Sequence, residues 1–261
     1  MLTGVRVLDL GDESGFLAGK LLGDLGADVV KLEPPGGDRR GRRAPYLGGR
    51  AEPERSLAWL ALNTSKRGIT LDLEADAGRA LFHRLVARFD VVLETAAPGA
   101  LAARGIGFED CRAAHPRLVW CSLTPFGSDG PRAGWRGGDL VAVAMGGNLA
   151  LTGHPDRPPV RCSMPMAYYH AGPEAALGIV MALHAREDSG RGQHVDVSLQ
   201  ETQLQSLLSA PGQHALAPRA MKRTGGRLGR TREIWAARDG WVSFGLRGGP
   251  ARVPNLVATV A

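Results

Sequence analysis

The chain has 261 residues, of which 44% are hydrophobic, and a formal net charge of +6 at pH 7. This length allows one large domain, or one domain with part of a second, and the hydrophobic content allows a full core. No apolar run reaches the ~18 residues of a membrane span, and the first residues lack the regions of a secretory signal. We therefore expect a cytoplasmic protein without membrane contact. The cysteines, Cys111, Cys121 and Cys162, are too widely spaced for a disulfide framework or a zinc site and indicate reduced thiols.

The positive charge comes from arginine, because only four of the 32 basic residues are lysine. It is concentrated in residues 39–43 and 219–232. Arginine binds phosphate and carboxylate through paired hydrogen bonds, so a phosphate-bearing ligand fits this charge, although charge alone does not identify it. A solvated surface or a subunit interface fits it as well. Neither stretch interleaves aromatic residues, so nucleic acid is not an expected partner.

Strands and helices alternate along the first half of the chain. The predicted strands are residues 5–10, 28–33, 69–73, 90–94 and 118–123, and the predicted helices are 15–25, 76–89, 108–114 and 139–145. Gly26 is placed for a left-handed helix end. Three of these stretches, VVKL (29–32), VVLE (91–94) and LVWCSL (118–123), are nearly continuous apolar runs, as expected where helices cover both faces of a sheet. The pattern predicts an α/β fold with an open, parallel, Rossmann-like sheet, flanking helices and right-handed crossovers.

The first strand–helix–strand unit ends in Glu33, about twenty residues after the first turn, which is typical of a dinucleotide-binding fold. However, the turn Gly11-Asp12-Glu13-Ser14-Gly15 lacks the G-x-G-x-x-G spacing. Two carboxylates stand where a pyrophosphate requires bare backbone amides. NAD or FAD binding is therefore not expected.

The stretch from residue 165 to 202 is the most informative. Pro173 suits the first helical residue, and Glu174 follows where a carboxylate meets the positive end of the helix dipole. The pattern predicts a helix that begins here and ends at Arg186. After a glycine-containing turn, residues 194–199 alternate polar and apolar side chains, which predicts a strand with one buried face.

Several segments are informative by their order and spacing: VLDL (7–10), GDLGADVVKLEPPGGD (23–38), NTSKRG (63–68), DVVLE (90–94), PRLV (116–119) and SGRGQHVDVSLQET (189–202). Together they resemble coenzyme A (CoA)-transferase family III, which includes formyl-CoA transferase, carnitine CoA-transferase and α-methylacyl-CoA racemase. The resemblance implies a large α/β domain over residues 1–198, a long helical linker over 199–222 and the start of a small domain over 223–261. It also implies a dimer of interlocked subunits.

Family members continue beyond the point that matches Ala261. The chain is therefore expected to be either naturally shortened or a product of a longer sequence. A half-built small domain would expose apolar surface, which implies that another chain covers it.

The resemblance implies covalent catalysis. In the family, an Asp attacks the acyl-CoA thioester to give a mixed anhydride, and CoA thiolate then converts the anhydride into an enzyme–CoA thioester. The Asp position, just before Tyr169-His170-Ala171-Gly172, holds Tyr168. A phenol with a pKa near ~10 is about one part in a thousand ionised at pH 7, and it has no carboxyl carbon. Tyr168 is therefore expected to occupy the nucleophile position as an inactive, packed aromatic.

Other side chains near this position are candidate substitutes. Glu174 is a candidate nucleophile, although an acid in a first helical turn usually has a structural role. His170 is a candidate base, although a lone His is more often a structural hydrogen-bonder. We expect Asp139 to orient backbone or cap the following helix. Cys162 has no paired His and is expected to be inert.

The resemblance also implies a CoA site that contains Ser14, Gly15, Pro34, Leu71, Thr95 and Ala96. CoA or an acyl-CoA would be a substrate; no permanently bound cofactor and no metal are expected. Two stretches depart from the family pattern: residues 14–16 are Ser-Gly-Phe where Ala-Gly-Pro is usual, and residues 95–97 are Thr-Ala-Ala where Asn-Phe is common.

Three hypotheses follow. In the first, the chain is the Asp-less subunit of a CoA-transferase that moves CoA between an acyl-CoA and a carboxylic acid, and an Asp-bearing homologue is its partner. Residues 231–250 resemble the Asp-less subunit of one such enzyme, benzylsuccinate CoA-transferase. In the second, the chain is an autonomous acyl-CoA racemase or isomerase, or a self-dimer with such chemistry, although the expected His–Asp pair corresponds to Gly138 and Tyr168. In the third, it is a non-catalytic module that binds CoA or acts as a scaffold.

Overall fold

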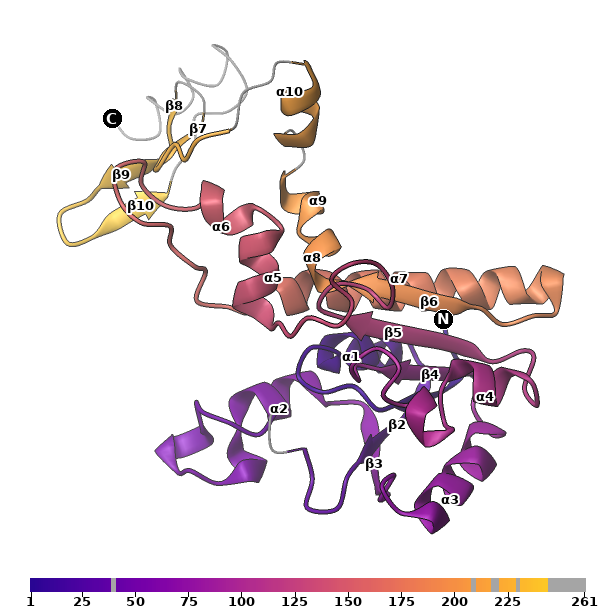
Figure 1. Cartoon of the computed structure of the whole chain (residues 1–261). Coiled ribbons are helices and arrows are strands. Elements are labelled where there is room, and N and C mark those ends of the chain that lie inside the picture. Colours follow the sequence, from indigo (N-terminus) through magenta and orange to yellow (C-terminus); the bar gives the residue numbers. More distant parts are fainter. Residues whose placement is uncertain (39–40, 208–209, 217–220, 229–230, 244–261) are drawn as a thin grey trace. The chain divides into compact units, whose positions relative to one another are not determined.

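The computed structural model describes residues 1–38, 41–207, 210–216, 221–228 and 231–243. The chain divides into two compact units (Figure 1). The first contains residues 1–146 and 163–205, and the second contains residues 147–162 and 206–261. The domain boundaries after residues 198 and 222 that the resemblance implies stay a prediction.

A six-stranded parallel sheet forms the centre of the first unit and confirms the predicted α/β class. Its strands are β1 (Arg6–Asp9), β2 (Asp28–Glu33), β3 (Lys66–Thr70), β4 (Val91–Glu94), β5 (Val119–Thr124) and β6 (His194–Ser198). Their spatial order is β3-β2-β1-β4-β5-β6, so the direction of chain progression reverses between β1 and β4. This reversal creates a topological switch point, where open α/β sheets bind ligands beyond the carboxyl ends of their strands.

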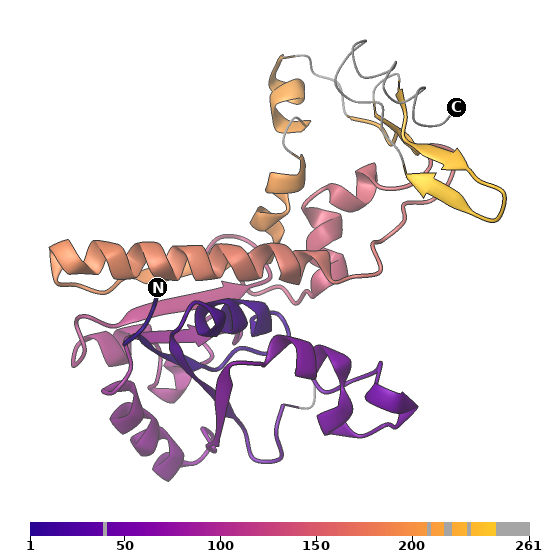
Figure 2. The same cartoon turned by 180° about the vertical axis from the view of Figure 1, so that it is seen from behind.

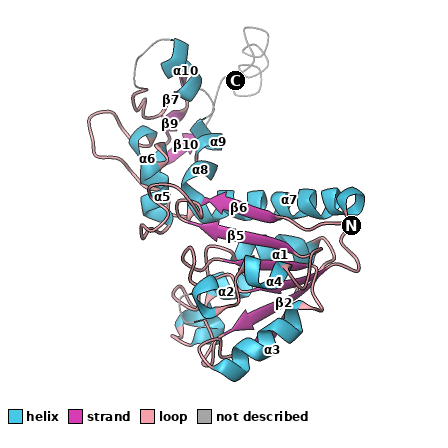
Figure 3. Cartoon of the chain, turned by 45° about the vertical axis from the view of Figure 1, so that its right-hand side comes forward, coloured by secondary structure: helices cyan, strands magenta, loops and turns pink. Residues whose placement is uncertain are grey.

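Helices cover both faces of the sheet. The main helices of this unit are α1 (Phe16–Asp24), α2 (Leu57–Leu62), α3 (Asp76–Val86), α4 (Phe108–Arg112), α5 (Asp139–Met145), α7 (Met166–Ser189) and α8 (Leu199–Thr202). Helices α1 and α7 lie side by side on one face, in indigo and salmon in Figure 2. Helices α3 and α4 pack on the other face (Figure 3), where Phe82 and Cys111 join a core with Leu8, Val92 and Trp120.

The apolar runs became the buried strands. Every residue of β4 and β5 is buried, as are four of the six residues of β2. Gly26 has φ of +101°, which confirms the left-handed helix end. The strand expected at 69–73 instead spans Lys66–Thr70, because β3 is the edge of the sheet and its exposed side chains carry no clear hydrophobic period.

The start of α7 differs from the prediction. The helix begins at Met166, and Pro173 lies inside it, so the prediction of a start at Pro173 was wrong. Proline removes one backbone hydrogen bond of a helix, but tertiary packing outweighs this cost. The preceding turns are buried at Ala167 and Ala171, and Gly172 packs so closely on α1 that a Cβ there would lie 2.8 Å from Leu17 Cβ.

The expected linker is helical in three pieces, α8, α9 (Leu204–Leu207) and α10 (Ala210–Leu216); residues 208–209 and 217–220 lie outside the described part. The second unit contains α6 (Asn148–Leu151) and two antiparallel pairs, β7 (Arg227–Leu228) with β8 (Thr231–Arg232) and β9 (Ile234–Ala236) with β10 (Trp241–Ser243). Within this unit the Arg223 guanidinium donates hydrogen bonds to the carbonyls of Ala150, His154 and Arg157.

Among the described residues, no helix combines the length and the apolar composition that crossing a bilayer requires. The cytoplasmic location stays a prediction. All three cysteines are unpaired. Burial, with a contribution from Asp110, raises the pKa of the Cys111 thiol to about 11.

Candidate functional site

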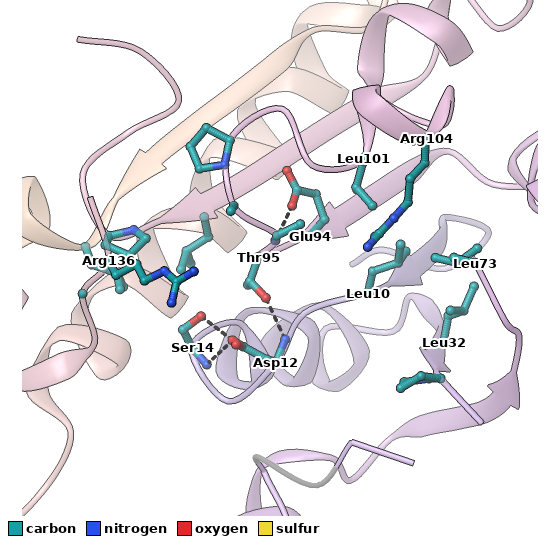
Figure 4. Close-up of a pocket in the computed structure, with 18 of the residues that line it drawn as sticks. Leu10, Asp12, Ser14, Leu32, Leu73, Glu94, Thr95, Leu101, Arg104 and Arg136 are labelled. Atoms are coloured by element: carbon teal, nitrogen blue, oxygen red, sulfur yellow. Dashed lines mark hydrogen bonds between the residues drawn. The ribbon is translucent and has the colours of Figure 1, made fainter. Parts of the chain in front are cut away.

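A cavity of about 1000 Å³ opens at the carboxyl ends of the strands around the switch point (Figure 4). Segments that follow β1, β2, β3, β4 and β5 line it, and α7 contributes Tyr168. Its volume reaches the upper end of the range of about 300–1,000 Å³ that is usual for small-molecule sites. The place and the size both make this cavity the candidate site.

Buried charged side chains fix the turn that follows β1. The Asp9 carboxylate, which is 0% exposed, accepts hydrogen bonds from Gly11 N–H at 2.8 Å and from Lys66 Nζ at 2.9 Å. Lys66 also donates to the Phe16 carbonyl at 2.9 Å, and Lys31 donates to the Gly11 carbonyl. Both ends of the turn are therefore fixed to the sheet.

Two cations share this one carboxylate. Burial alone would raise the pKa of Asp9, but the nearby charges of Lys31 and Lys66 outweigh it and lower the pKa. Burial lowers the pKa of Lys66, and the attraction of Asp9 only partly opposes this. Asp9, Lys31 and Lys66 thus form a buried cluster of one carboxylate and two lysines.

The middle of the same turn faces the cavity. The Asp12 N–H donates to Thr95 Oγ1 at 2.8 Å, which joins the turn to the segment after β4. The hydroxyl and N–H of Ser14 donate to Asp12 Oδ1 at 2.6 and 3.0 Å (Figure 4). At Gly15, a Cβ would lie 2.9 Å from Thr95 Cγ2, so glycine permits the close approach.

Glu94 ends β4 and is 7% exposed. Its carboxylate accepts hydrogen bonds from the Ser122 hydroxyl and, at 2.6 Å, from the Ala96 N–H. Burial raises the pKa of Glu94, and these hydrogen bonds offset the effect only in part. The Ser122 Oγ also lies 2.9 Å from Nε2 of His194.

Two arginines, Arg104 and Arg136, line the cavity on opposite sides of the Asp12–Thr95 contact (Figure 4). Arg104 also forms an ion pair with Glu74 at 2.5 Å. The sequence reasoning missed both arginines, because neither belongs to a basic cluster. The available signal was their place in loops after predicted parallel strands, where ligand contacts concentrate.

The described arginines of the basic stretch at residues 39–43 pair with acids. Arg42 pairs with Glu33 and, at 2.9 Å, with Glu54, and Arg43 pairs with Glu13. Residues 39–40 lie outside the described part of the chain. The described residues also contain no group of three or more His, Cys, Asp or Glu side chains that could hold a metal ion.

Five of the six residues expected at a CoA site line the cavity: Ser14, Pro34, Leu71, Thr95 and Ala96. The sixth, Gly15, contacts Thr95 behind the lining. The structure thus brings together residues from four separate segments of the chain. That CoA occupies this cavity stays a prediction.

Tyr168 lies in the first turn of α7. The Asp139 carboxylate caps this turn by accepting a hydrogen bond from Ala167 N–H at 2.8 Å, in agreement with the role expected for Asp139. A Cβ at Gly138 would lie 3.3 Å from the Tyr168 hydroxyl. Burial raises the pKa of Tyr168; a hydrogen bond with the Asp139 backbone opposes this, and the charge of Asp12 adds to it. The phenol is therefore neutral at physiological pH.

His170 and Glu174 do not line the cavity. Because α7 begins at Met166, Glu174 lies beyond the first turn, where it accepts a hydrogen bond from Gln205 Nε2. Burial raises the pKa of Glu174. The expectation that Glu174 lies at the helix terminus was therefore wrong, because α7 begins eight residues earlier. His170 Nδ1 is buried and has no hydrogen-bond partner among the described residues.

Comparisons with known proteins agree with this architecture. The family profile described as CoA-transferase family III matches residues 2–260. The chain is 41% identical over 228 residues to succinyl-CoA–D-citramalate CoA-transferase of Chloroflexus aurantiacus, which covers 86% of the chain and 55% of that protein. It is 38% identical over 205 residues to the BbsE subunit of succinyl-CoA:(R)-benzylsuccinate CoA-transferase of Thauera aromatica, with 78% and 50% covered.

Among solved structures, a CAIB/BAIF family protein from Brucella suis superposes with a TM-score of 0.84 and 34% identity, over 92% of this chain and 64% of that one. The chain spans about half the length of the curated relatives that it matches. The profile match and the identities together show that the chain belongs to CoA-transferase family III.

Proposed function

We propose that this chain is a subunit of an enzyme that moves CoA between an acyl-CoA and a carboxylic acid, and that it does not itself carry the acyl group. The observation that carries the proposal is the place of Tyr168. This residue occupies the position at which the family resemblance implies the nucleophilic Asp, and its side chain lines the cavity.

The chemistry explains why Tyr168 cannot take over the transfer. The nucleophile has to be ionised at neutral pH and has to form an anhydride, and then a CoA thioester, at its own carboxyl carbon. The pKa of Tyr168 is raised above its ordinary value, chiefly by burial, so the phenolate is scarce. A phenol also offers no carbonyl carbon that CoA thiolate could attack.

The cavity supports a CoA thioester as the ligand. Arg104 and Arg136 supply two separated cations, and guanidinium groups suit phosphate oxygens. Apolar side chains, such as Leu71 and Leu73, line the space between the polar loops. No permanently bound cofactor is needed for this chemistry, since CoA enters and leaves as part of the substrates.

The partner in this proposal is a homologous chain that carries the Asp. One of the relatives is named as a subunit of its enzyme, which supports a mixed complex. An interlocked arrangement of two such chains stays a prediction, as does a dimer of this chain with itself.

The test is co-expression of this chain with an Asp-bearing homologue from the same genome. We expect a mixed complex by native mass spectrometry that exchanges CoA between acids, and no exchange by this chain alone. In the homologue, replacing its Asp with Ala should abolish exchange. CoA transfer by the purified chain alone would contradict the proposal.

A second candidate is proton exchange at the α-carbon of an acyl-CoA. One observation favours it: Asp12 lies close enough to Tyr168 to raise the tyrosine pKa, which sets a carboxylate and a neutral phenol in the same cavity. Incubation of the chain with acyl-CoA in deuterated water tests it. Deuterium uptake that Tyr168→Phe or Asp12→Asn abolishes would support this candidate, and no uptake with several acyl groups would dismiss it.

A further inference from the structure

The cavity is lined by two loops that approach each other across the switch point. One is the turn after β1, residues 11–15, and the other is the segment after β4, residues 95–98. Each loop is tied to its own strand by a buried acid. Asp9 holds the first through Gly11 N–H, and Glu94 holds the second through Ala96 N–H.

Thr95 connects the two loops. Its hydroxyl oxygen accepts the Asp12 N–H at 2.8 Å, and its methyl group occupies the space where a Cβ of residue 15 would lie. The backbone at Gly15 has φ of −99° and ψ of −10°, which any residue adopts. The nearest atom to a Cβ at this position is the Thr95 methyl carbon, so close packing and not backbone strain favours glycine there.

We propose that Thr95 is a positioning residue that holds the turn after β1 against the end of β4 and thereby sets the shape of the ligand cavity. The hydroxyl group and the methyl group of Thr95 have separate roles. The hydroxyl fixes the backbone of Asp12, and the Asp12 side chain accepts a hydrogen bond from Ser14 at the cavity. The methyl group packs where a Cβ of residue 15 would lie. The consequence for CoA binding rests on the proposed function; the coupling of the loops does not.

Two substitutions distinguish the effect of the Thr95 hydroxyl group from that of its methyl group. Thr95→Val keeps the shape and removes the hydroxyl, whereas Thr95→Ser keeps the hydroxyl and removes the methyl group. The control is Thr124→Val, the same change at a residue 1% exposed whose hydroxyl has no hydrogen-bond partner among the described residues. Hydrogen exchange of the Asp12 amide, measured by NMR on the protein without ligand, reports the loop contact directly.

We expect Thr95→Val to accelerate exchange of the Asp12 amide about tenfold, as the loss of one hydrogen bond implies, while Thr95→Ser and Thr124→Val leave it slow. Titration calorimetry with CoA should show binding weakened about fivefold by Thr95→Val alone. Unchanged amide exchange in Thr95→Val would overturn the proposal. If the wild-type chain does not bind CoA, the CoA-binding part of the proposed function fails, whereas amide exchange still decides the role of Thr95.

The methyl group is tested by rescue. Gly15→Ala should lower the melting temperature and accelerate Asp12 exchange, because the new Cβ meets Thr95 Cγ2 at 2.9 Å. In the Thr95→Ser background, Gly15→Ala should lower the melting temperature and accelerate Asp12 exchange much less. The rescue should be partial, since a Cβ at 15 also lies 3.3 Å from Gly11 Cα. Equal damage in both backgrounds would show that the methyl group does not determine the residue at 15.

Discussion

Two buried carboxylates end adjacent parallel strands, and they differ in charge environment. Asp9 ends β1 and faces α1, where two lysines surround it; its pKa is lowered although burial alone would raise it. Glu94 ends β4 on the opposite face, among the hydroxyl and N–H groups of Ser122 and Ala96. Burial raises the pKa of Glu94, because dipoles offset desolvation less than full charges do.

The difference shows that two buried acids at the ends of neighbouring strands have separate tasks. The Asp9 cluster fixes the turn after β1 through ion pairs with two buried lysines. Glu94 organises the segment after β4 with hydrogen bonds whose strength depends on its own protonation. Four substitutions test how these buried polar groups contribute to stability.

The largest effect is expected from Lys66→Met. It removes the cation 2.9 Å from Asp9, whose carboxylate is fully buried, and should lower the free energy of unfolding by about 3 kcal/mol at pH 7. Because the stabilisation from the lowered pKa of Asp9 is present above pH 3.8 and is lost in acid, the difference in stability between wild type and variant should shrink as the pH falls. Urea unfolding over a pH series measures both.

The matched control for this experiment is Lys20→Met. Lys20 pairs with Asp24 at 2.6 Å on the surface, and the loss should be below about 1 kcal/mol. Equal losses of unfolding free energy in the two lysine variants would contradict this prediction, since the buried cluster would then stabilise the fold no more than a surface ion pair does.

Ser122→Ala should have the next largest effect. It removes a hydrogen bond to the buried Glu94 carboxylate, which should cost about 2 kcal/mol at pH 7 and less in acid, where Glu94 is protonated. Ser128→Ala removes a comparable bond, at 2.9 Å to Asp196 in an exposed place, and serves as the control. A loss independent of pH would argue against an ionised Glu94 as the acceptor.

Glu94→Gln should produce a smaller effect that changes with pH. A pKa raised above the unfolded value of 4.5 stabilises the fold below that pH, and this stabilisation is lost as pH rises through the folded pKa. The wild type should therefore lose stability relative to the Gln variant as pH increases from 4 toward 7. Thermal unfolding of both proteins across this interval gives the difference, and a constant difference would refute the raised pKa.

Thr124→Val is expected to have the smallest effect, and it should be stabilising. The Thr124 hydroxyl is buried without a hydrogen-bond partner among the residues that the structure describes. Its replacement by an isosteric methyl group should raise the free energy of unfolding by about 1 kcal/mol. A destabilised variant would indicate that an ordered water satisfies this hydroxyl.

Much of the fold could be predicted because its signals are local. The segment DVVKLE became β2 without a change of boundary, and Asp139–Met145 became α5. The ion cluster was missed, although Lys31 within an otherwise apolar strand was a signal. A lysine buried in a sheet requires a carboxylate, but only the three-dimensional register brings Asp9 and Lys66 to it.

The start of α7 could not be read from local signals. Pro173 is a strong start signal by itself, and the packing of Gly172 on α1 that overrides it joins residues far apart in the sequence. The cavity depends on such long-range contacts too. The hydrogen bond from Asp12 to Thr95 spans 83 residues, and the close approach of Gly15 to Thr95 joins the two departures from the family pattern, so no local pattern predicted either contact.

The Asp139 cap on α7 has a consequence for how this protein could change over evolutionary time. Because Asp139 holds the first turn of α7 through the Ala167 backbone, the direction of the Cα–Cβ bond at residue 168 is set by the backbone and not by the residue's own side chain. The codons for tyrosine and aspartate differ by a single base. Gain or loss of a carboxylate at this position therefore requires neither a new backbone nor a new helix, and natural selection can sample both versions of the chain from the same fold.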